Sequence, residues 1–307
     1  MAAMSHSKDL FPVESVDALS AGALGFMPRL LVLTTLPHRR PTSHRFERVN
    51  GQHSLRMSSP RRIGLPYGSY PRLILIYLTT AAVRSKSREI ELGRSPNDFA
   101  RRLGLTPISG KRGTVYRLQD QLERLFTTRL NWRFSKDSSS HESGHGLIIT
   151  GDTGLQFLRR VLPRKPATWR PKVVLSRAIF QGITRSSVPI DLRAVHQLKH
   201  SPLAIDIYIW LTHRMSYLRR PSLIPWKALQ NQFGADYGRL SDFRRKFLLS
   251  LRLVLGIYDV ARVSSRDQGL VLLRSPTHLP SISGQVPAGP PPYGFQPKDA
   301  VIDRSLD

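Results

Sequence analysis

The strongest constraint on how this chain can fold is an order of elements that the sequence contains twice. In the stretch "SPNDFARRLGL", Ser95 is placed to cap a short helix, Pro96 suits its first turn and Gly104 suits its end. Residues 225–234 repeat this arrangement, with a proline at the start and a glycine at the end. After each short helix the sequence predicts a longer helix and then two strands. The two copies have few identical residues, but their elements come in the same order and at nearly the same spacing along the chain. This indicates a duplicated unit.

Apolar residues at helical spacing predict the two longer helices. The first begins at Thr114 and has the stripe Val115, Leu118, Leu122, Leu125 and Phe126, and the second spans residues 240–255 and has the stripe Leu240, Phe243, Phe247, Leu251 and Val254. Leu130, Trp132 and Phe134 then alternate as a strand, and "GLIIT" (residues 146–150) supplies a returning strand. In the second copy, "YDVARV" and "LVLLR" lie on either side of a turn at "SSRDQG".

Short helix, turn, long helix and hairpin is the order of a winged helix-turn-helix. The sequence therefore predicts an α+β fold of two tandem winged helix-turn-helix domains with a disordered Pro-rich C-terminal tail. Asn50-Gly51 lies between two alternating runs and predicts an additional β-hairpin in the first domain. The predicted parts are a disordered N-terminus (1–18), a first domain (19–161), a linker (162–171), a second domain (172–275) and a disordered tail (276–307).

A dense apolar stretch precedes the first copy, but it is too short for a membrane segment. Thr79, Thr80 and Arg84 interrupt it well before the roughly 20 residues that a membrane-spanning helix needs. Residues 19–36 form a second apolar run, but a proline and an arginine lie at its centre, and acidic residues precede it where a signal peptide needs positive charge. We therefore expect a cytoplasmic protein with no membrane partner and a core helix at residues 71–86. The predicted packing residues of this helix are Leu73, Ile74, Tyr77 and Leu78.

The charge balance indicates a polyanionic partner. The 307 residues include 47 Lys and Arg against 21 Asp and Glu, which gives a formal net charge of +26 at pH 7. Such an excess repels itself on a folded surface unless a polyanion neutralises it, and nucleic acid does so through its phosphates. Two alternatives stay open, namely ribosome-like RNA binding and a GC-rich genome that favours arginine. The absence of cysteine excludes disulfides, zinc fingers and thiol nucleophiles.

No motif in the sequence supplies a convincing catalytic centre. "HESGH" (residues 141–145) has the letters of a zinc-protease signature, but it lies in a Ser/Gly loop where no helix is expected. "SGKRGT" (residues 109–114) lacks the glycine spacing and the hydroxyl group of a phosphate-binding loop. The histidines do not form the His–apolar–His metal pair that DNA-nicking enzymes need. We therefore expect a non-enzymatic protein without metal or cofactor.

The second helix of a helix-turn-helix contacts base edges, and the flanking loops contact phosphates. Helical wheels anchored on the apolar stripes turn polar and charged residues of both longer helices outward. The predicted DNA-binding residues are Lys111, Arg112, Arg117, Gln121 and Arg124 in the first domain, and Arg239, Arg245, Lys246 and Arg252 in the second. Arg244 falls nearer the apolar stripe. Because the second helix is predicted to expose more cations than the first, we expect it to supply more of the affinity for DNA. Leu249 and Leu253, opposite the second stripe, are the only hint of a dimer surface.

A further signal lies in the motif "GLPYGSYPRL" (residues 64–73), the run "LTTAAVR" (residues 78–84) and the spaced residues Leu92-Gly93, Ser95, Phe99 and Leu103 to Leu105. Through these residues the chain resembles plasmid-encoded replication initiators of the RepA type over roughly residues 20–130. Residues 23–38 are also similar to the N-terminal region of that family, which makes them a folded part of the first domain.

The resemblance implies a protein that binds tandem repeats, called iterons, in duplex DNA of a plasmid origin. It further implies melting of adjacent AT-rich DNA, recruitment of the host initiator and the replicative helicase, and homodimers that repress while monomers initiate. The main alternative is a sequence-specific transcription repressor without an initiation role. An RNA-binding protein and an enzyme that nicks or recombines DNA are further alternatives.

Overall fold

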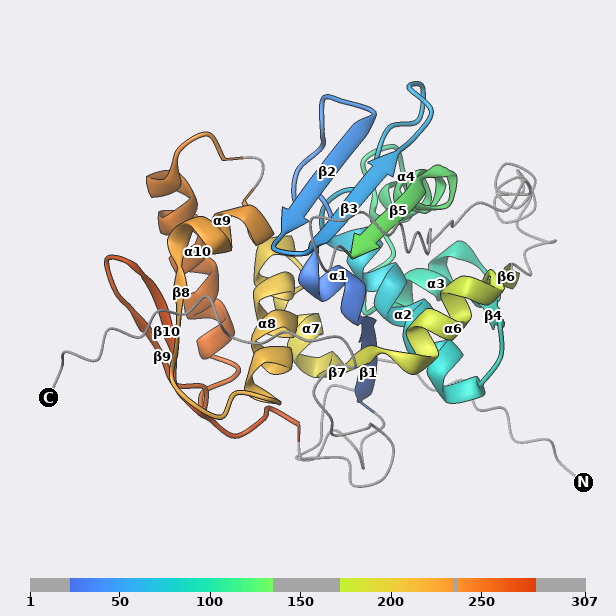
Figure 1. The fold of residues 1–307 in the computed structure, drawn as a ribbon. Coiled ribbons are helices and arrows are strands. Elements are labelled where there is room, and N and C mark those ends of the chain that lie inside the picture. Colours follow the sequence, from blue (N-terminus) through green and yellow to red (C-terminus); the bar gives the residue numbers. More distant parts are fainter. Residues whose placement is uncertain (1–22, 135–171, 235–236, 280–307) are drawn as a thin grey trace, which may run out of the picture.

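The structure is a computed structural model that describes residues 23–134, 172–234 and 237–279, with mixed α and β elements (Figure 1). In chain order, the first half contains β1 (Leu24–Pro28), α1 (Arg29–Leu33), β2 (Arg45–Asn50), β3 (His53–Ser58), α2 (Ser69–Ser85), β4 (Glu89–Glu91), α3 (Pro96–Arg102), α4 (Thr114–Thr127) and β5 (Arg129–Phe134). The second half contains β6 (Lys172–Val174), α6 (Arg177–Arg185), β7 (Ser187–Asp191), α7 (Leu192–Leu198), α8 (Pro202–Met215), β8 (Ser222–Pro225), α9 (Trp226–Phe233), α10 (Leu240–Leu255), β9 (Val263–Ser265) and β10 (Gly269–Leu272). The helices that the sequence predicts are confirmed, with small shifts of their ends.

Local sequence signals explain where several elements of the first half begin or turn. The Oγ atom of Ser95 accepts a hydrogen bond from the backbone N–H of Asp98 (3.0 Å), so Ser95 caps α3 as predicted. β2 and β3 form the predicted hairpin, in which Asn50 lies opposite His53 around Gly51. β5 pairs antiparallel with β3 and completes a three-stranded sheet. The predicted returning strand and the "HESGH" stretch lie outside the described residues.

In the second half, the elements from α8 to β10 form one unit. β10 lies between β8 and β9 and pairs antiparallel with both strands. α10 packs against α8 and α9 through Phe243 and Phe247, which are fully buried. The prediction that Leu240 belongs to the buried stripe is wrong, because this residue begins α10 at the rim of a surface groove and is 41% exposed.

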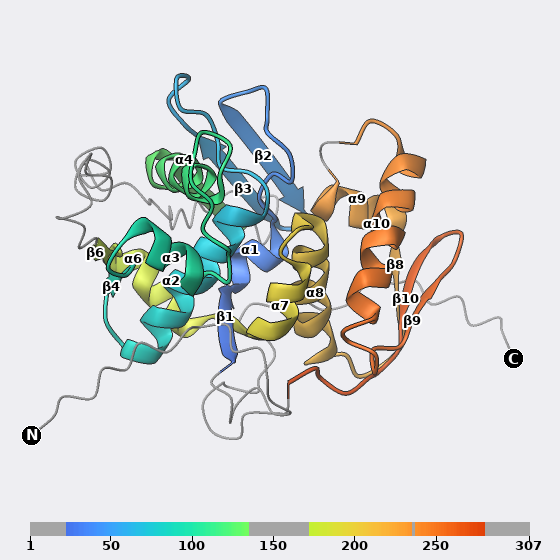
Figure 2. The same ribbon diagram turned by 180° about the vertical axis from the view of Figure 1, so that it is seen from behind.

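Two buried helices, α2 and α8, lie at the centre of the molecule, between α4 and α10 (Figures 1 and 2). α2 is buried at every position from Pro71 to Thr80, which confirms the predicted packing residues, and α8 is buried at every position from Leu203 to Thr212. A helix that is apolar on all sides lies in the interior of a protein. One hydrophobic core therefore runs through both halves. Among the described helices, none is both long and apolar enough to cross a lipid bilayer.

Two short sheets join the halves of the chain. β1 pairs antiparallel with β7, with Gly25 opposite Ile190, and β4 pairs antiparallel with β6, with Ile90 opposite Val173. α6 also packs against α2, and α1 packs against α8. Residues 172–191, which the sequence assigns to the second domain, are therefore built onto the first half. The predicted linker at residues 162–171 lies outside the described residues.

A fully buried ion pair also joins the halves. Arg72 on α2 donates from Nε to Oδ1 of Asp206 on α8 (2.8 Å) and from Nη2 to Oδ2 of the same residue (2.6 Å). His38 Nε2 lies 2.8 Å from the same Oδ2 atom. The remaining N–H groups of the guanidinium donate to the backbone carbonyl oxygens of Leu36, Pro37 and Gly68. The pairing with Asp206 explains why an arginine occupies position 72, at the start of the otherwise apolar stretch of α2.

The predicted disordered tail begins at residue 276, but this prediction is wrong for residues 276–279. His278 Nδ1 lies 2.8 Å from the hydroxyl oxygen of the buried Tyr208. Leu279 is only 5% exposed and packs against Ala23. The hydroxyl of Tyr258 donates to the carbonyl oxygen of Pro276 (2.7 Å). Composition predicted disorder for the whole segment, but a buried tyrosine hydroxyl requires a hydrogen-bond partner, and His278 supplies one.

Candidate nucleic-acid interface

A tight turn places two cations at the start of α4. Gly110 has a φ angle of +94°, and the N–H of Gly113 donates to the carbonyl oxygen of Gly110 (2.9 Å). Gly113 cannot have a side chain, because a Cβ atom there would overlap the carbonyl oxygen of Ile108. Lys111 and Arg112 lie within this turn and are exposed. Since a helix N-terminus has a partial positive charge, the turn and the helix together favour a negatively charged group.

The structure divides the predicted residues of α4 into two classes. Arg117 is exposed, and its neighbour Tyr116, which was not among the predicted contacts, is 54% exposed. Gln121 and Arg124 are only 4% and 8% exposed, so the prediction that they face outward is wrong. Nε of Arg124 donates to Oδ2 of Asp120 (2.8 Å) along the helix. A helical wheel misplaces both residues because it contains no information about the loop that covers this side of α4.

The covering loop is the segment between β3 and α2, residues 59–68, here called the post-β3 loop. Oε1 of Gln121 accepts a hydrogen bond from the backbone N–H of Tyr67 (2.9 Å), and the guanidinium carbon of Arg124 lies 5.6 Å from the centre of the Tyr67 ring. Gly64, with a φ angle of +80°, allows the backbone to pass close to Arg124. Gln121 and Arg124 therefore hold this loop on α4.

α10 turns all of its predicted cations outward. Arg245 and Arg252 lie opposite the buried residues Phe243, Phe247, Leu251 and Val254, while Lys246 flanks this stripe and Arg239 is the N-cap residue of the helix. The exposed cations are Arg239, Arg245, Lys246 and Arg252. The side chain of Arg245 is 78% exposed, and its Nη2 atom lies 3.8 Å from Oδ1 of Asp242, which is too long for a hydrogen bond. An exposed pair of this kind contributes little energy, so a ligand can replace it at low cost.

Arg244 belongs to the fold and not to this exposed face. Its guanidinium carbon lies 5.1 Å from the centre of the Trp226 ring, and its Nη2 atom donates to Oδ1 of Asp267 (3.2 Å). Asp267 lies in the turn between β9 and β10, so Arg244 joins α10 to this hairpin. The expectation that Arg244 lies nearer the apolar stripe is confirmed.

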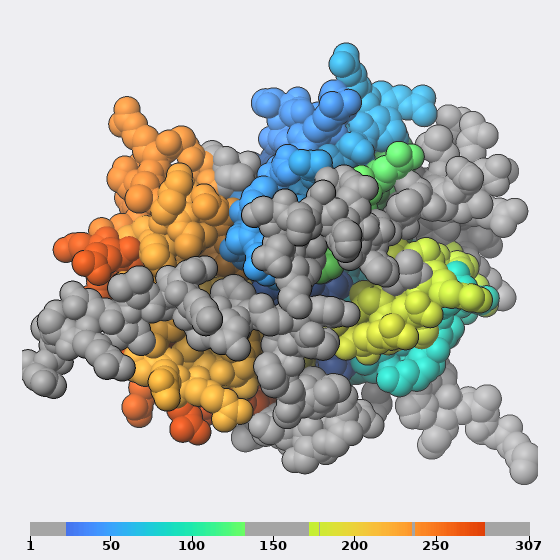
Figure 3. All heavy atoms as spheres, viewed as in Figure 1, coloured from blue at the N-terminus to red at the C-terminus, as the bar shows by residue number. Residues whose placement is uncertain are grey.

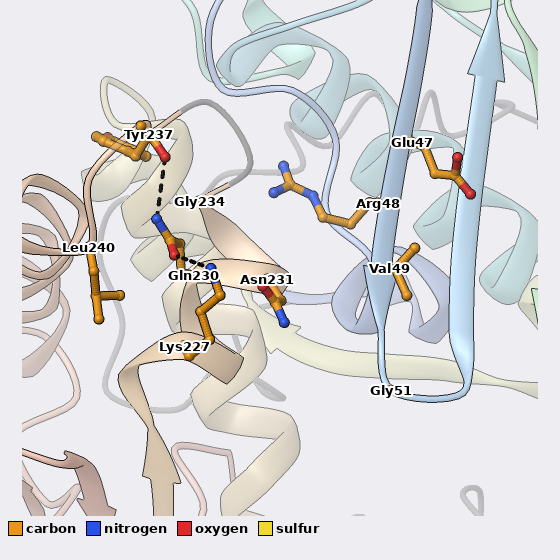
Figure 4. A pocket seen from close by; sticks show the side chains of 11 residues that line it. Glu47, Arg48, Val49, Gly51, Lys227, Gln230, Asn231, Gly234, Tyr237 and Leu240 are labelled. Atoms are coloured by element: carbon orange, nitrogen blue, oxygen red, sulfur yellow. Dashed lines mark hydrogen bonds between the residues drawn. The ribbon is translucent and has the colours of Figure 1, made fainter.

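A groove of about 570 Å³ separates β2 from α9 and the start of α10 (Figure 4). Figure 4 shows Arg48 extending from β2 toward the side of the groove that α9 forms. On that side, Lys227 Nζ donates to Oε1 of Gln230 (3.1 Å), and Nε2 of Gln230 donates to the carbonyl oxygen of Tyr237 (3.3 Å). Tyr237 precedes α10, so the groove lies beside the N-terminus of that helix.

Exposed guanidinium groups on a helix can bind DNA in two ways. They can donate two hydrogen bonds to O6 and N7 of a guanine in the major groove, or they can contact phosphate oxygens. The exposed residues of α4 and α10 have the chemistry for both.

A family model described as "Plasmid encoded RepA protein" matches residues 65–226, which is more than half of the 307 residues. The chain belongs to the family of plasmid-encoded RepA proteins.

The resemblance that the "GLPYGSYPRL" region indicated is thereby confirmed. In this RepA-family protein, the matched region contains α2, α3 and α4 and ends at Trp226, the first residue of α9. α10 and the hairpin of β9 and β10 lie beyond the match. The assignment of α10 to the interface therefore depends on its geometry and charge.

The RepA-family chain is also similar to the crystal structure of RctB domains 2-3 (RctB-155-483). The two are 12% identical, the similarity covers 79% of this chain and 94% of that chain, and the TM-score is 0.42. A comparison with curated proteins found no match.

Proposed function

We propose that this RepA-family protein is a plasmid replication initiator that binds repeated sites (iterons) in the duplex DNA of its origin. Two winged helix-turn-helix units would make the contacts, one from α2 to β5 and one from α8 to β10. The order α8, β8, α9, α10, β9 and β10, with β10 between the other two strands, supports this assignment for the second unit. The three helices of the first unit, α2, α3 and α4, correspond in order to α8, α9 and α10 of the second unit.

The observation that carries the proposal is the charged face of α10. Arg239, Arg245, Lys246 and Arg252 are exposed on the helix that enters the major groove in winged helix-turn-helix proteins. The net charge of +26 supplies the non-specific attraction to DNA that precedes sequence recognition. Lys111, Arg112 and Arg117 would make the corresponding contacts at α4, while Gln121 and Arg124 would act only by holding the post-β3 loop.

Membership of the RepA family supports the rest of the proposal. The bound protein would promote melting of the adjacent AT-rich DNA and recruit the host initiator and the replicative helicase. It would act in the cytoplasm by binding and not by catalysis, without a cofactor, and a homodimer would repress where the monomer initiates. Leu249 and Leu253, which are 50% and 56% exposed on α10, are candidates for the dimer contact.

The test is autonomous replication. A plasmid that has this gene and its upstream DNA, but no other origin, is expected to be maintained in a permissive host. The variant with Arg245→Ala and Lys246→Ala is expected to lose maintenance while keeping its folded content by circular dichroism. A transcription repressor would instead lower expression from the upstream promoter and give no transformants. Preference for structured RNA over duplex DNA in competition, or conversion of supercoiled DNA to a nicked form, would favour the other two alternatives.

A further inference from the structure

Exposed arginines gather on two loops that lie outside the predicted DNA-binding residues. The first is the segment before β2, residues 38–44, here called the pre-β2 loop, and the second is the post-β3 loop. Neither loop contains Asp or Glu. Their exposed arginines are Arg39, Arg40, Arg61 and Arg62. Within the described residues, no ion pair joins any of these four guanidinium groups to a carboxylate.

The two loops form one unit. The backbone N–H of Ser59 donates to the carbonyl oxygen of His44 (3.0 Å), and the N–H of Gly68 donates to the carbonyl oxygen of Pro37 (3.1 Å). The loops are therefore joined where they meet the hairpin of β2 and β3 and again at their other end. In Figure 1 both loops project from the upper edge of the molecule, and in the space-filling view their atoms protrude there (Figure 3). Four cations are thus presented on one rim without a neutralising acid in either loop.

This unit bridges the two helices that are proposed to read DNA. The post-β3 loop rests on α4 through Tyr67, whose N–H donates to Gln121. The pre-β2 loop reaches the start of α10, because the guanidinium carbon of Arg39 lies 5.6 Å from the centre of the Tyr237 ring. A duplex that contacts both α4 and α10 therefore has to pass over the loops or directly beside them.

We propose that the pre-β2 and post-β3 loops form a phosphate-binding track that contacts the DNA backbone between α4 and α10. This inference rests on the proposed binding of duplex DNA. Guanidinium groups suit the task because they are always charged and donate two hydrogen bonds to one phosphate. Contacts with phosphates have no sequence preference, so the track supplies affinity and fixes the position of the duplex. Sequence discrimination stays with α4 and α10.

The experiment compares two variants in which the same amount of positive charge is removed. In the track variant Arg39, Arg40, Arg61 and Arg62 are changed to Ala, and in the control variant Arg177, Arg185, Arg219 and Arg220, which are also exposed, are changed to Ala. Affinity for a duplex from the DNA beside the gene and for a random duplex of equal length is measured by fluorescence anisotropy over a range of salt concentrations. Circular dichroism and the melting temperature report whether each variant is folded.

The track variant is expected to bind both duplexes more weakly by the same factor, so that the ratio between them is unchanged. Its plot of log K against log salt should be less steep by about 0.9 for each phosphate that the variant no longer neutralises, or about 3.6 for four phosphates. Replacement of the same four residues by Lys should restore most of the slope, because lysine also neutralises phosphate.

Three results would overturn the inference: a slope like that of the wild type, an equal change in the control variant, or a weakening confined to the origin duplex. Unfolding of the track variant would also count against it, because the cation–π contact of the exposed Arg39 with Tyr237 is too weak for its loss to unfold the protein. A wild-type protein that binds both duplexes equally would instead refute the proposed function, whatever the track variant does.

Discussion

Arg72 and Asp206 show how single residues determine the arrangement of this protein. The two residues are 134 positions apart in the sequence and meet in the fully buried space between α2 and α8. Burial by itself would raise the pKa of Asp206, but the charge of Arg72 and hydrogen bonds from His38 and Arg72 hold this pKa below its usual value. All N–H groups of the guanidinium have acceptors. Such a pair tolerates joint replacement better than the removal of one member.

Replacement of Asp206 by Asn is expected to lower the free energy of unfolding by about 3–5 kcal/mol, because it leaves the charge of Arg72 buried without a counterion. The measurement is urea unfolding followed by circular dichroism at pH 7. The matched control is Glu47→Gln, which breaks the exposed pair with Arg56 and should cost less than about 1 kcal/mol. A decrease of similar size in the two variants would show that the buried pair has no special role.

His213 is expected to make the protein less stable in weak acid. Burial, together with the nearby charges of Arg29 and Arg214, lowers the pKa of His213 to about 4. The unfolded chain, with an ordinary histidine pKa of about 6.5, therefore binds the proton more readily than the folded protein as the pH falls. The stabilisation is complete above pH 6.5 and is lost as the pH falls toward 4. In His213→Gln, the decrease in unfolding free energy from pH 7 to pH 5 should be smaller by about 2 kcal/mol.

Urea unfolding at several pH values provides the measurement for His213. Above pH 7 the wild type and His213→Gln should show the same pH dependence, which serves as the internal control. If the two proteins also respond identically between pH 7 and pH 5, His213 is not the group responsible.

At the scale of elements, α4 and α10 have unequal surfaces. Of the three α4 residues that are predicted to bind DNA, only Arg117 is exposed, because Gln121 and Arg124 are covered by the post-β3 loop. In the part of the chain that the structure describes, no loop covers the corresponding side of α10, and the predicted cations Arg239, Arg245, Lys246 and Arg252 are all exposed. The expectation that the second helix supplies more affinity than the first is therefore strengthened at this scale, although it stays a prediction.

Arg245→Ala and Arg117→Ala provide the comparison. We expect Arg245→Ala to weaken binding to the origin duplex by about 1–3 kcal/mol and binding to a random duplex by less, because an arginine–guanine contact depends on sequence. Arg117→Ala should cost less on the origin duplex. Anisotropy titrations of each variant with each duplex, at one fixed salt concentration, give the affinities that are compared. An equal weakening on the two duplexes would make Arg245 a phosphate contact and would refute its assignment to base recognition.

At the scale of the whole molecule, segments far apart in the sequence complete one core. β1 pairs with β7, β4 pairs with β6, and residues 276–279 return to the second half, where His278 lies between Tyr208 and Tyr258. Leu279 packs against Ala23, which immediately precedes β1. Both ends of the described chain therefore contribute to its stability.

Two truncations test this contribution. Removal of residues 280–307 is expected to leave the melting temperature nearly unchanged, since the composition of this segment predicts disorder. Removal of residues 276–307 should lower it by several degrees, because the buried hydroxyl of Tyr208 loses His278 and Leu279 no longer packs against Ala23. Differential scanning calorimetry of the two proteins gives the comparison. Equal melting temperatures would show that residues 276–279 add nothing.

The sequence by itself determined those features whose causes lie within a few residues of one another. The cap at Ser95, the turn at Asn50-Gly51 and the apolar stripe of α10 all depend on neighbours along the chain, and each was predicted correctly apart from Leu240. Family membership was also readable, because the "GLPYGSYPRL" motif is contiguous.

Only the tertiary structure decided which polar residues face solvent and which segments meet. Gln121 and Arg124 lie on the outward side of a helical wheel, yet a loop from residues 59–68 buries them. The partner of Arg72 is on a helix more than a hundred residues away, and the partner of Tyr208 lies in a segment whose composition predicts disorder. The physical reason is the same in each case. A side chain is buried or exposed according to what packs over it, and periodicity along one helix contains no information about a covering segment from elsewhere in the chain.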